Sequence, residues 1–238
     1  MADKSVDKLT ELLAAEGRNL NTSQIHKFKL YTKHLLEKNE VMNLTSVTDP
    51  EEIAIKHYYD SVIPFCKLNI SGKETLLDIG SGAGFPAIPL KIIFPGLKII
   101  MADSLKKRVN FLNECISLLS FDNIAAIHAR AEELPAEMRG KFNIVTARAV
   151  APLNILCEYA LPYLKKGGSF IALKGQKNDD EIKGASRAIA LLGGKLTDAL
   201  LFELPEDTGQ RSIYIITKIS QTPTAYPRKP HQIKKEPL

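Results

Sequence analysis

Residues Thr75 to Ser104 read TLLDIGSGAGFPAIPLKIIFPGLKIIMADS. An apolar run of strand length opens this segment, and the glycine-rich turn Gly80–Gly84 follows it. The apolar stretch Phe85–Phe94 predicts a helix, because its early proline suits a first helical turn and Pro95-Gly96 stops it. A second apolar run ends on Asp103. Strand, glycine loop, helix, strand and acid in this order predict the first βαβ unit of a Rossmann-like sheet, with Asp103 placed to grip a ribose hydroxyl.

The glycine spacing narrows the ligand class. A dinucleotide fingerprint reads G-x-G-x-x-G, whereas this loop reads G-x-G-x-G and places Phe85 after Gly84. Bare glycines let a ligand approach the backbone at a helix N-terminus. In its context, DIGSGAG resembles motif I of S-adenosylmethionine-dependent methyltransferases. The alternatives are a dinucleotide site and a βα turn that binds nothing.

Composition limits the fold and the compartment. The chain has 238 residues, of which 45% are hydrophobic, so one α/β domain with an appendage is expected and global disorder is excluded. Three widely spaced cysteines, without a C-x-x-C motif, predict reduced thiols. The N-terminus lacks a signal-peptide pattern, and no apolar run has membrane-spanning length. We therefore expect a soluble, cytoplasmic protein with no membrane partner. A monomer without a metal site is also expected, although none of these features fixes the oligomeric state.

The positive charge is uneven along the chain. The formal net charge is +5, and residues 220–238 hold four Lys or Arg against a single acid. A basic tail suits a polyanionic partner, and it equally suits a solvated segment that aids solubility. Its prolines predict an extended, polyproline-like path without a regular helix. Tyr226, Arg228 and Lys229 have the chemistry to stack on bases and neutralise phosphates.

Residues 1–70 are predicted to form an N-terminal helical region. Asn21-Thr22-Ser23 offers a helix N-cap, and Asp49-Pro50 starts a later helix with Glu52 as the partner in a capping box. The polar residues of this region have two interpretations. Asn39 and Asn43 suit a helix C-cap and turn, and His57 with Asp60 suits a local hydrogen-bonded pair. Alternatively, all four line a substrate cleft that faces the glycine loop.

Residues 71–219 are predicted to form the Rossmann-like domain, and residues 220–238 the basic proline-rich tail. After Asp103 the pattern alternates between helices and strands and then ends in an antiparallel hairpin. The expected ranges are strands at Ile124–His128, Phe142–Ala147 and Phe170–Leu173, helices at Leu105–Leu119, Leu153–Leu164 and Glu181–Leu192, and a hairpin of Leu200–Leu204 with Ser212–Lys218. This order predicts an α/β fold of the class I methyltransferase type, mostly parallel with an antiparallel C-terminal hairpin strand, plus an N-terminal helical cap.

Five segments in this order resemble the bacterial 16S ribosomal RNA small-subunit methyltransferase G family, also called glucose-inhibited division protein B. They are Asn39 with Asn43-Leu44-Thr45, His57 with Asp60-Ser61, Leu77 to Pro86, Arg130-Ala131-Glu132 with Thr146 to Ala151, and Tyr226 to Lys229. The family often has a tryptophan where Lys38 stands here, and His231-Gln232-Ile233 interrupts the usual end of the tail. The resemblance implies methylation of N7 of guanine 527 of 16S rRNA, with S-adenosylmethionine as the methyl donor and 16S rRNA or the small ribosomal subunit as partner.

The resemblance also implies roles for individual residues. The cofactor would contact Gly80, Gly82, Gly84 and Phe85 at its methionine end, Asp103 at its ribose, and Ala131 and Glu132 at its adenine. Arg148 would close the cofactor site or meet the base or a phosphate, unless it is a structural ion-pair partner. Asn39, Asn43, His57 and Asp60 would line the target-base side, and Arg228 and Lys229 would hold RNA backbone. Asp78 is expected to support the glycine loop.

Three residue patterns bear on the target atom. The loop Arg148–Pro152 lacks the Asn/Asp-Pro-Pro-aromatic motif used on exocyclic amines. Cys157 has no His or second Cys near it in sequence, which disfavours covalent addition to a pyrimidine. Guanine N7 has an in-plane lone pair and needs no general base, so these patterns fit N7. The rival classes are a small-molecule methyltransferase on the same fold and a non-enzymatic RNA- or dinucleotide-binding protein.

Overall fold

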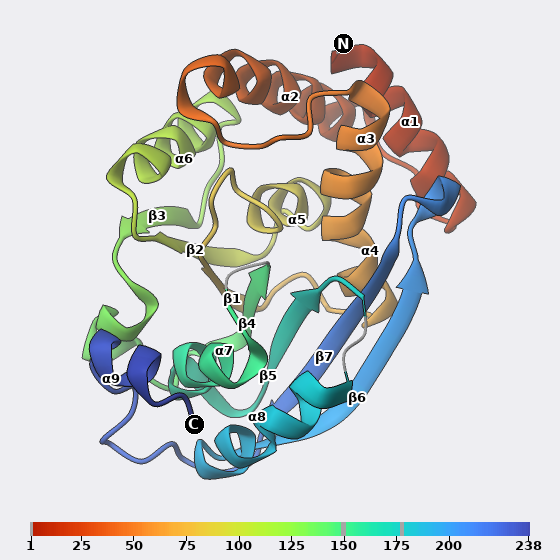
Figure 1. Ribbon diagram of the computed structural model, residues 1–238. Helices are drawn as coiled ribbons and strands as arrows, with labels where there is room; N and C mark the ends of the chain where they lie inside the picture. The colour runs from red at the N-terminus through yellow and green to blue at the C-terminus, as the bar shows by residue number, and fades with distance from the viewer. Residues whose placement is uncertain (1, 149–150, 177–178) are drawn as a thin grey trace.

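The computed structural model describes residues 2–148, 151–176 and 179–238. Its strands form one seven-stranded sheet in the order β3-β2-β1-β4-β5-β7-β6 (Figure 1). Pairing is parallel from β3 through to β5, and β7 is antiparallel to both of its neighbours. The strands are β1 Thr75–Ile79, β2 Lys98–Asp103, β3 Ile124–His128, β4 Phe142–Arg148, β5 Leu164–Lys174, β6 Gly194–Glu203 and β7 Gln210–Lys218. The predicted Rossmann-like sheet with an antiparallel hairpin is therefore confirmed.

Helices cover both faces of the sheet (Figure 1). One face carries α1 Ala2–Ala15, α2 Thr22–Met42, α3 Pro50–Ile53, a π-helical turn η1 Ala54–Tyr59, α4 Asp60–Lys67, α5 Ala87–Ile93 and α6 Lys106–Leu118. The other face carries α7 Leu153–Ala160 and α8 Asp179–Leu191, with α9 Pro230–Lys235 beside α7. Short 3₁₀ turns follow β3 (Ala131–Glu133, Ala136–Met138), α7 (Leu161–Tyr163) and β6 (Pro205–Asp207). None of the helices in the described ranges is long and apolar enough to cross a bilayer.

Alternate side chains along the central strands pack into two separate hydrophobic cores, one on each face of the sheet. Leu76 of β1 points into the core beneath α1 to α6, and Leu77 points into the core beneath α7 and α8. This alternation explains why the central strands read as continuous apolar runs, since both faces are buried. The parallel strands β2, β1 and β4 all end at one edge, so Asp103, the glycine loop and Arg148 meet there.

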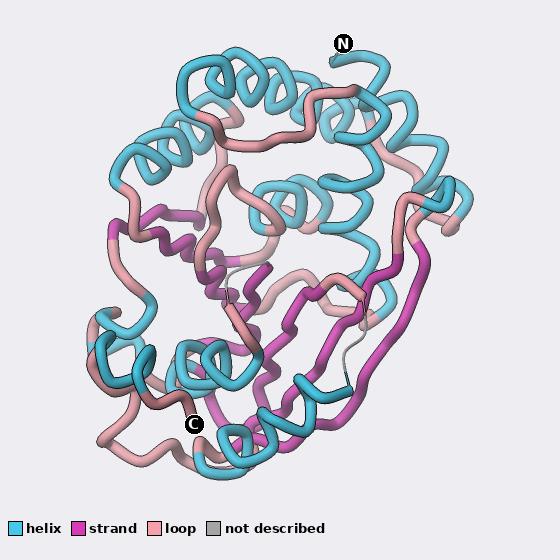
Figure 2. The backbone as a smooth tube through the Cα atoms, viewed as in Figure 1, coloured by secondary structure: helices cyan, strands magenta, loops and turns pink. Residues whose placement is uncertain are grey.

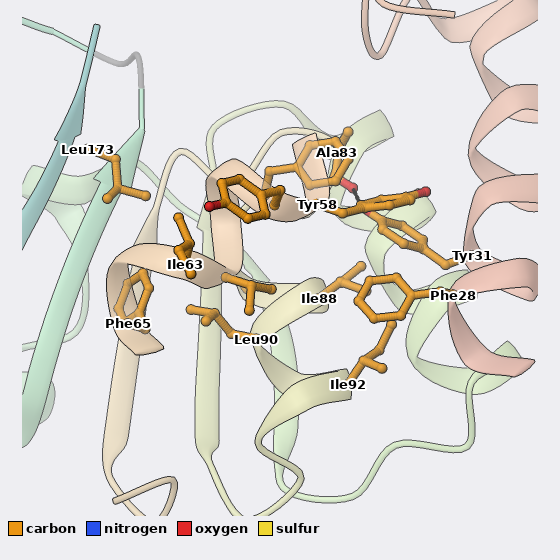
Figure 3. Packing of buried hydrophobic residues seen from close by; sticks show 14 of the residues in the cluster. Phe28, Tyr31, Tyr58, Ile63, Phe65, Ala83, Ile88, Leu90, Ile92 and Leu173 are labelled. Carbon is orange, nitrogen blue, oxygen red and sulfur yellow. Dashed lines mark hydrogen bonds between the residues drawn. The ribbon is translucent and has the colours of Figure 1, made fainter. Parts of the chain in front are cut away.

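A group of aromatic rings joins the N-terminal helices to the glycine loop. Figure 3 shows Tyr31 of α2 and Tyr58 of η1 packed beside Ala83. The buried Tyr31 hydroxyl donates to the Ala83 carbonyl at 2.6 Å. The Tyr31 and Phe85 ring centroids lie 5.7 Å apart. The helical region therefore forms one wall of the space in front of the loop.

The N-terminal caps agree with expectation in part. Asn21 caps α2 in a capping box with Gln24, and Asp49 caps α3 through the amides of Glu51 and Glu52. The predicted second half of the later capping box is wrong. The Glu52 side chain instead pairs with Lys56 at 2.5 Å, which lies one helical turn further along the same face.

Several predicted boundaries also differ from the structure. The strand expected to begin at Leu200 begins six residues earlier, at Gly194. The helix expected over Leu153–Leu164 ends at Ala160, because Pro162 cannot continue it, and a 3₁₀ turn leads directly into β5. The Lys-Lys-Gly-Gly run expected to stop that helix lies inside β5. The tail contains a regular helix, α9, because Pro230 occupies its first turn, where no amide hydrogen is needed. Figure 2 shows the loop that carries the chain from β7 to this helix.

Candidate active site

The glycine loop needs glycine for two different reasons. Gly82 has φ +57°, and its amide donates to Asp103 Oδ2 at 2.9 Å. Gly84 has φ +99°, and a Cβ there would lie 2.5 Å from the Ile88 side chain. The first glycine therefore serves the loop conformation, and the second also permits close packing of the loop on α5.

Asp103 ends β2 as predicted and is almost fully buried. Its two carboxylate oxygens accept hydrogen bonds from the amides of Gly82 and Leu105, each at 2.9 Å. The Arg108 guanidinium lies 3.6 Å from Oδ2. The carboxylate is therefore held rigidly at the edge of a cavity, against the glycine loop.

This cavity has a volume of 840 Å³ and opens between the glycine loop and the N-terminal helices. Its walls bring together five groups from separate parts of the sequence. They are the loop Gly80–Ala83 with Phe85, the β2 end Asp103-Ser104 with Arg108, the α2–α3 connection Leu44, Thr45 and Val47, the helical residues Lys56, His57 and Asp60, and the strand ends Arg148, Leu173 to Gly175 and Arg211. The predicted cleft between the helical region and the loop is thus present.

Asp60 is the centre of a charged cluster in the cavity wall. The Arg211 Nε atom lies 3.2 and 3.1 Å from its two carboxylate oxygens. Arg148 NH1 lies 3.4 Å from Oδ2 and donates to the Lys56 carbonyl at 3.1 Å. Burial lowers the pKa of Arg148, and the nearby Asp60 carboxylate opposes that shift. Two arginines share one carboxylate, so the cluster keeps one excess positive charge.

His57, Phe85 and Arg148 form a layered contact beside this cluster. The His57 and Phe85 rings stack at 4.4 Å between centroids, and the Arg148 guanidinium lies 4.9 Å from the Phe85 centroid. His57 Nε2 lies 2.7 Å from Thr45 Oγ1. Burial and the neighbouring Arg148 lower the pKa of His57 to about 3, so the ring is neutral at physiological pH. His57 and Asp60 therefore have different partners, and the expected alternative of a local His57–Asp60 pair is wrong.

The two asparagines shape the connection after α2. Asn43 is the left-handed C-cap of α2, and its amide donates to the Asn39 carbonyl. The Asn39 side chain accepts from the Thr45 amide at 2.8 Å. Among the described residues, the cavity wall contains Leu44 and Thr45 and neither asparagine. The capping interpretation of Asn43 is confirmed, and both residues act on the cavity through the backbone that presents Thr45.

A second, smaller cavity adjoins the first. It has a volume of 240 Å³ and shares Gly80 and Ser104 with the large one. Its remaining wall consists of Ile79, Ala102, Ala129 to Glu132, Ala151, Ile155, Tyr159 and Lys234. Ala131 and Glu132 therefore lie beyond the Asp103 end of the glycine loop, on the side expected for the adenine of a bound nucleoside.

The tail residue Arg228 is held inside the protein. Its guanidinium donates to both carboxylate oxygens of Glu158, with Nε at 2.9 Å from Oε1 and NH2 at 2.7 Å from Oε2, and Glu158 is 1% exposed. A further guanidinium nitrogen donates to the Glu236 carbonyl at 3.0 Å. These bonds hold the Arg228 guanidinium against α7, an arrangement that does not favour its expected contact with RNA backbone. Lys229 precedes α9 and is exposed, which leaves its ammonium accessible.

Asp78 is a buried acid beside the glycine loop. It is 0% exposed, and neither carboxylate oxygen has a hydrogen-bond partner within the described ranges. Desolvation raises the pKa of Asp78 to about 7. The Ser81 hydroxyl donates to the Asp78 backbone carbonyl at 3.2 Å, so Asp78 supports the glycine loop as expected, through its main chain. An acid without a donor leaves an unmet demand for a donor or a positive charge at this end of the loop.

Sequence reasoning missed Arg211, Thr45 and the hydrogen-bonding role of Tyr31. Arg211 belongs to a hairpin strand 151 residues from Asp60, so only the sheet order brings them together. Thr45 was visible as part of the motif, but its hydroxyl could not be distinguished from the neighbouring asparagine side chains. Residues 149 and 150, in the loop expected after β4, lie outside the described residues.

Comparisons with known proteins agree on one family. The model of the family rRNA small subunit methyltransferase G matches residues 24–211. The chain is 48% identical to the ribosomal RNA small subunit methyltransferase G of Staphylococcus saprophyticus and 46% identical to that of Staphylococcus aureus strain Newman. Both matches extend over 235 residues and 98% of each chain.

Solved structures at low sequence identity share the fold. A variant of the 16S rRNA (adenine(1408)-N(1))-methyltransferase from Catenulisporales acidiphilia is 14% identical, with a TM-score of 0.54. The match covers 68% of this chain and 92% of that one. Geranyl diphosphate methyltransferase in complex with SAM also has a TM-score of 0.54 at 14% identity, covering 68% of this chain and 85% of that one. These likenesses establish the methyltransferase fold.

Proposed function

The chain belongs to the family of rRNA small subunit methyltransferase G, and on this basis we propose that it methylates N7 of guanine 527 in 16S ribosomal RNA. The methyl donor is S-adenosylmethionine. One observation carries the proposal: a single cavity joins the glycine loop with Asp103 to a buried cluster of Asp60, Arg148 and a neutral His57. A cofactor subsite and a base subsite therefore face each other.

The residues around the glycine loop fit this cofactor, which supplies a methyl group on a positively charged sulfur. Gly80, Gly82, Gly84 and Phe85 would hold its methionine end, and Asp103 its ribose. Ala131 and Glu132 would border its adenine. The buried Asp103 carboxylate, held at the cavity edge by the amides of Gly82 and Leu105, suits a cofactor that carries ribose hydroxyls.

The opposite wall suits a target that needs positioning and no proton removal. His57 is neutral and stacked, so it presents a flat polar face. Burial raises the pKa of the Cys157 thiol, and this side chain is fully buried, so it is unsuited to nucleophilic addition. The N7 edge of guanine also carries the acceptor O6. We assign Arg148, fixed by Asp60 and the Lys56 carbonyl, as the donor to O6, which leaves the N7 lone pair free for transfer.

The same proposal assigns the remaining parts of the chain. Residues 1–70 form the substrate side, residues 71–219 bind the cofactor, and residues 220–238 form a basic segment in which Lys229 contacts RNA. The partner is 16S rRNA or the small ribosomal subunit. The protein acts in the cytoplasm as a monomer and needs no membrane.

Methyl transfer to small ribosomal subunits that lack the modification tests the function. With methyl-labelled S-adenosylmethionine, we expect label in 16S rRNA at one guanine, located by cleavage chemistry specific for N7-methylguanine. Asp103→Ala should weaken binding of S-adenosylhomocysteine at least tenfold, because a buried hydrogen-bonding carboxylate is lost. Label at another atom, or turnover on small molecules without RNA, would refute the proposal. Unchanged affinity in Asp103→Ala would refute the ribose assignment alone.

A further inference from the structure

The C-terminal segment is anchored to one side of α7. Arg228 pairs with the buried Glu158 of this helix, and Asn154 Nδ2 donates to the Leu238 carbonyl at 3.0 Å. Ile233 of α9 is 0% exposed. An ion pair, a hydrogen bond to the chain end and an apolar anchor therefore hold the segment in place. A loose solvated arm would show none of these contacts.

The neighbouring side of α7 forms part of the smaller cavity. Ile155 and Tyr159 line that cavity, and each follows directly after an anchor residue, Asn154 or Glu158. The tail and the cavity thus both adjoin the same two turns of α7. In addition, α9 itself reaches the cavity, because Lys234 is one of its lining residues.

We propose that α9 is a wall of the adenine pocket and that Lys234 positions the adenine end of the cofactor. The inference rests on the proposed function for the identity of the ligand. The cavity wall around Lys234 is largely apolar, with Ile79, Ala102 and Ile155 among its members. Lys234 is exposed and yet lines the cavity, which is the behaviour of a lysine whose methylene stem covers apolar surface while its ammonium stays in water. The stem then closes the pocket over the edge of the ring.

This assignment changes the expected role of the basic tail. Of its four cations, Arg228 is bound to Glu158, and Lys234 lines the cavity that Glu132 also lines. We therefore expect the tail to contribute more to binding of the cofactor than to binding of RNA. Removing the Lys234 contact should alter cofactor affinity and leave the affinity for RNA unchanged.

Calorimetric titration of the full-length protein tests the proposal. The ligands are S-adenosylhomocysteine and 5′-methylthioadenosine, which lacks the amino-acid end. Lys234→Ala should weaken both about four- to fifteenfold, the effect of uncovering one or two methylene groups. Lys234→Met keeps the stem and should restore most of the affinity. Lys235→Ala is the matched control, because it removes the next lysine of the same helix, which does not line the cavity.

A kinetic measurement distinguishes positioning from a general effect on folding. In Lys234→Ala, KM for S-adenosylmethionine should rise by the same factor, with kcat at saturating cofactor and Tm unchanged. Equal affinities of Lys234→Ala and Lys235→Ala would overturn the proposal, as would a loss of RNA affinity with intact cofactor binding. Failure of the wild-type protein to bind either nucleoside would instead refute the proposed function.

Discussion

Replacing one oxygen of the Asp60 carboxylate by an amide nitrogen should lower the free energy of unfolding substantially. Asp60→Asn keeps the size of the side chain and removes the charge shared by Arg148 and Arg211. The side chains of Asp60, Arg148 and Arg211 are 8%, 18% and 24% exposed, so water replaces the lost partner only in part. Breaking a buried ion pair costs about 3–5 kcal/mol. Because the cluster borders an open cavity, we expect a loss of roughly 2–3 kcal/mol in the free energy of unfolding.

Urea denaturation and thermal unfolding measure this loss. For a chain of this length, it corresponds to a decrease in Tm of about 5–10 °C. The matched control is Glu52→Gln, which breaks the more exposed pair with Lys56 in the same helical segment and should cost about 0.5 kcal/mol or less. Methyl transfer by Asp60→Asn should decrease by at least tenfold at a temperature where the variant is folded, because Arg148 loses its alignment. A stability change no larger than that of Glu52→Gln would refute the argument that the cluster is effectively buried.

Three further outcomes are expected. Arg228→Met should cost about 3–5 kcal/mol in urea denaturation, because Glu158 becomes a buried unpaired charge, whereas Lys229→Met should stay within about 0.5 kcal/mol. Asp78 ionises near 3.8 when unfolded and near 7 when folded, so unfolding releases a proton and the apo protein loses stability as pH rises through this window. Asp78→Asn should abolish that loss, roughly 2–4 kcal/mol, and a parallel pH profile would contradict it. His57 has the opposite sign: its pKa falls from 6.5 to about 3 on folding, so stability decreases as pH falls below 6.5, and His57→Gln should flatten that acid limb of the unfolding profile.

Local signals predicted the elements that form the cofactor side. The run from Thr75 to Ser104 holds a strand, a loop, a helix and a strand in immediate succession, so its chemistry is encoded without any distant contact. Asp103 lies where the motif places it because β1 and β2 pair in parallel register, with Ile79 opposite Ala102. Proline and glycine were less decisive. A proline stops α7, because Pro162 follows its last turn, whereas Pro230 occupies the first turn of α9 and is tolerated there.

The substrate side depends on contacts that no local pattern contains. Asp60 was identified as a candidate, but its strongest partner, Arg211, comes from the antiparallel strand β7. Asn39 and Asn43 have side chains as suitable for a base as that of Thr45, and only the left-handed cap at Asn43 turns the threonine toward the cavity. Sequence reasoning therefore located the correct segments on this side and could not select the atoms that face the cavity.

Charge counting along the sequence is least reliable where oppositely charged partners are distant. The tail is the most basic part of the chain by composition, yet Arg228 is paired with a buried carboxylate while its neighbour Lys229 is exposed. Glu158, which neutralises Arg228, lies 70 residues earlier in the sequence, so no local pattern connects the two residues. An electrostatic surface for RNA must consequently be sought among cations whose charge remains exposed. Lys106 and Lys107 meet this condition, because both are exposed at the start of α6, directly before Arg108 in the cavity wall. We therefore expect the phosphate backbone to approach the cavity from the side of α6.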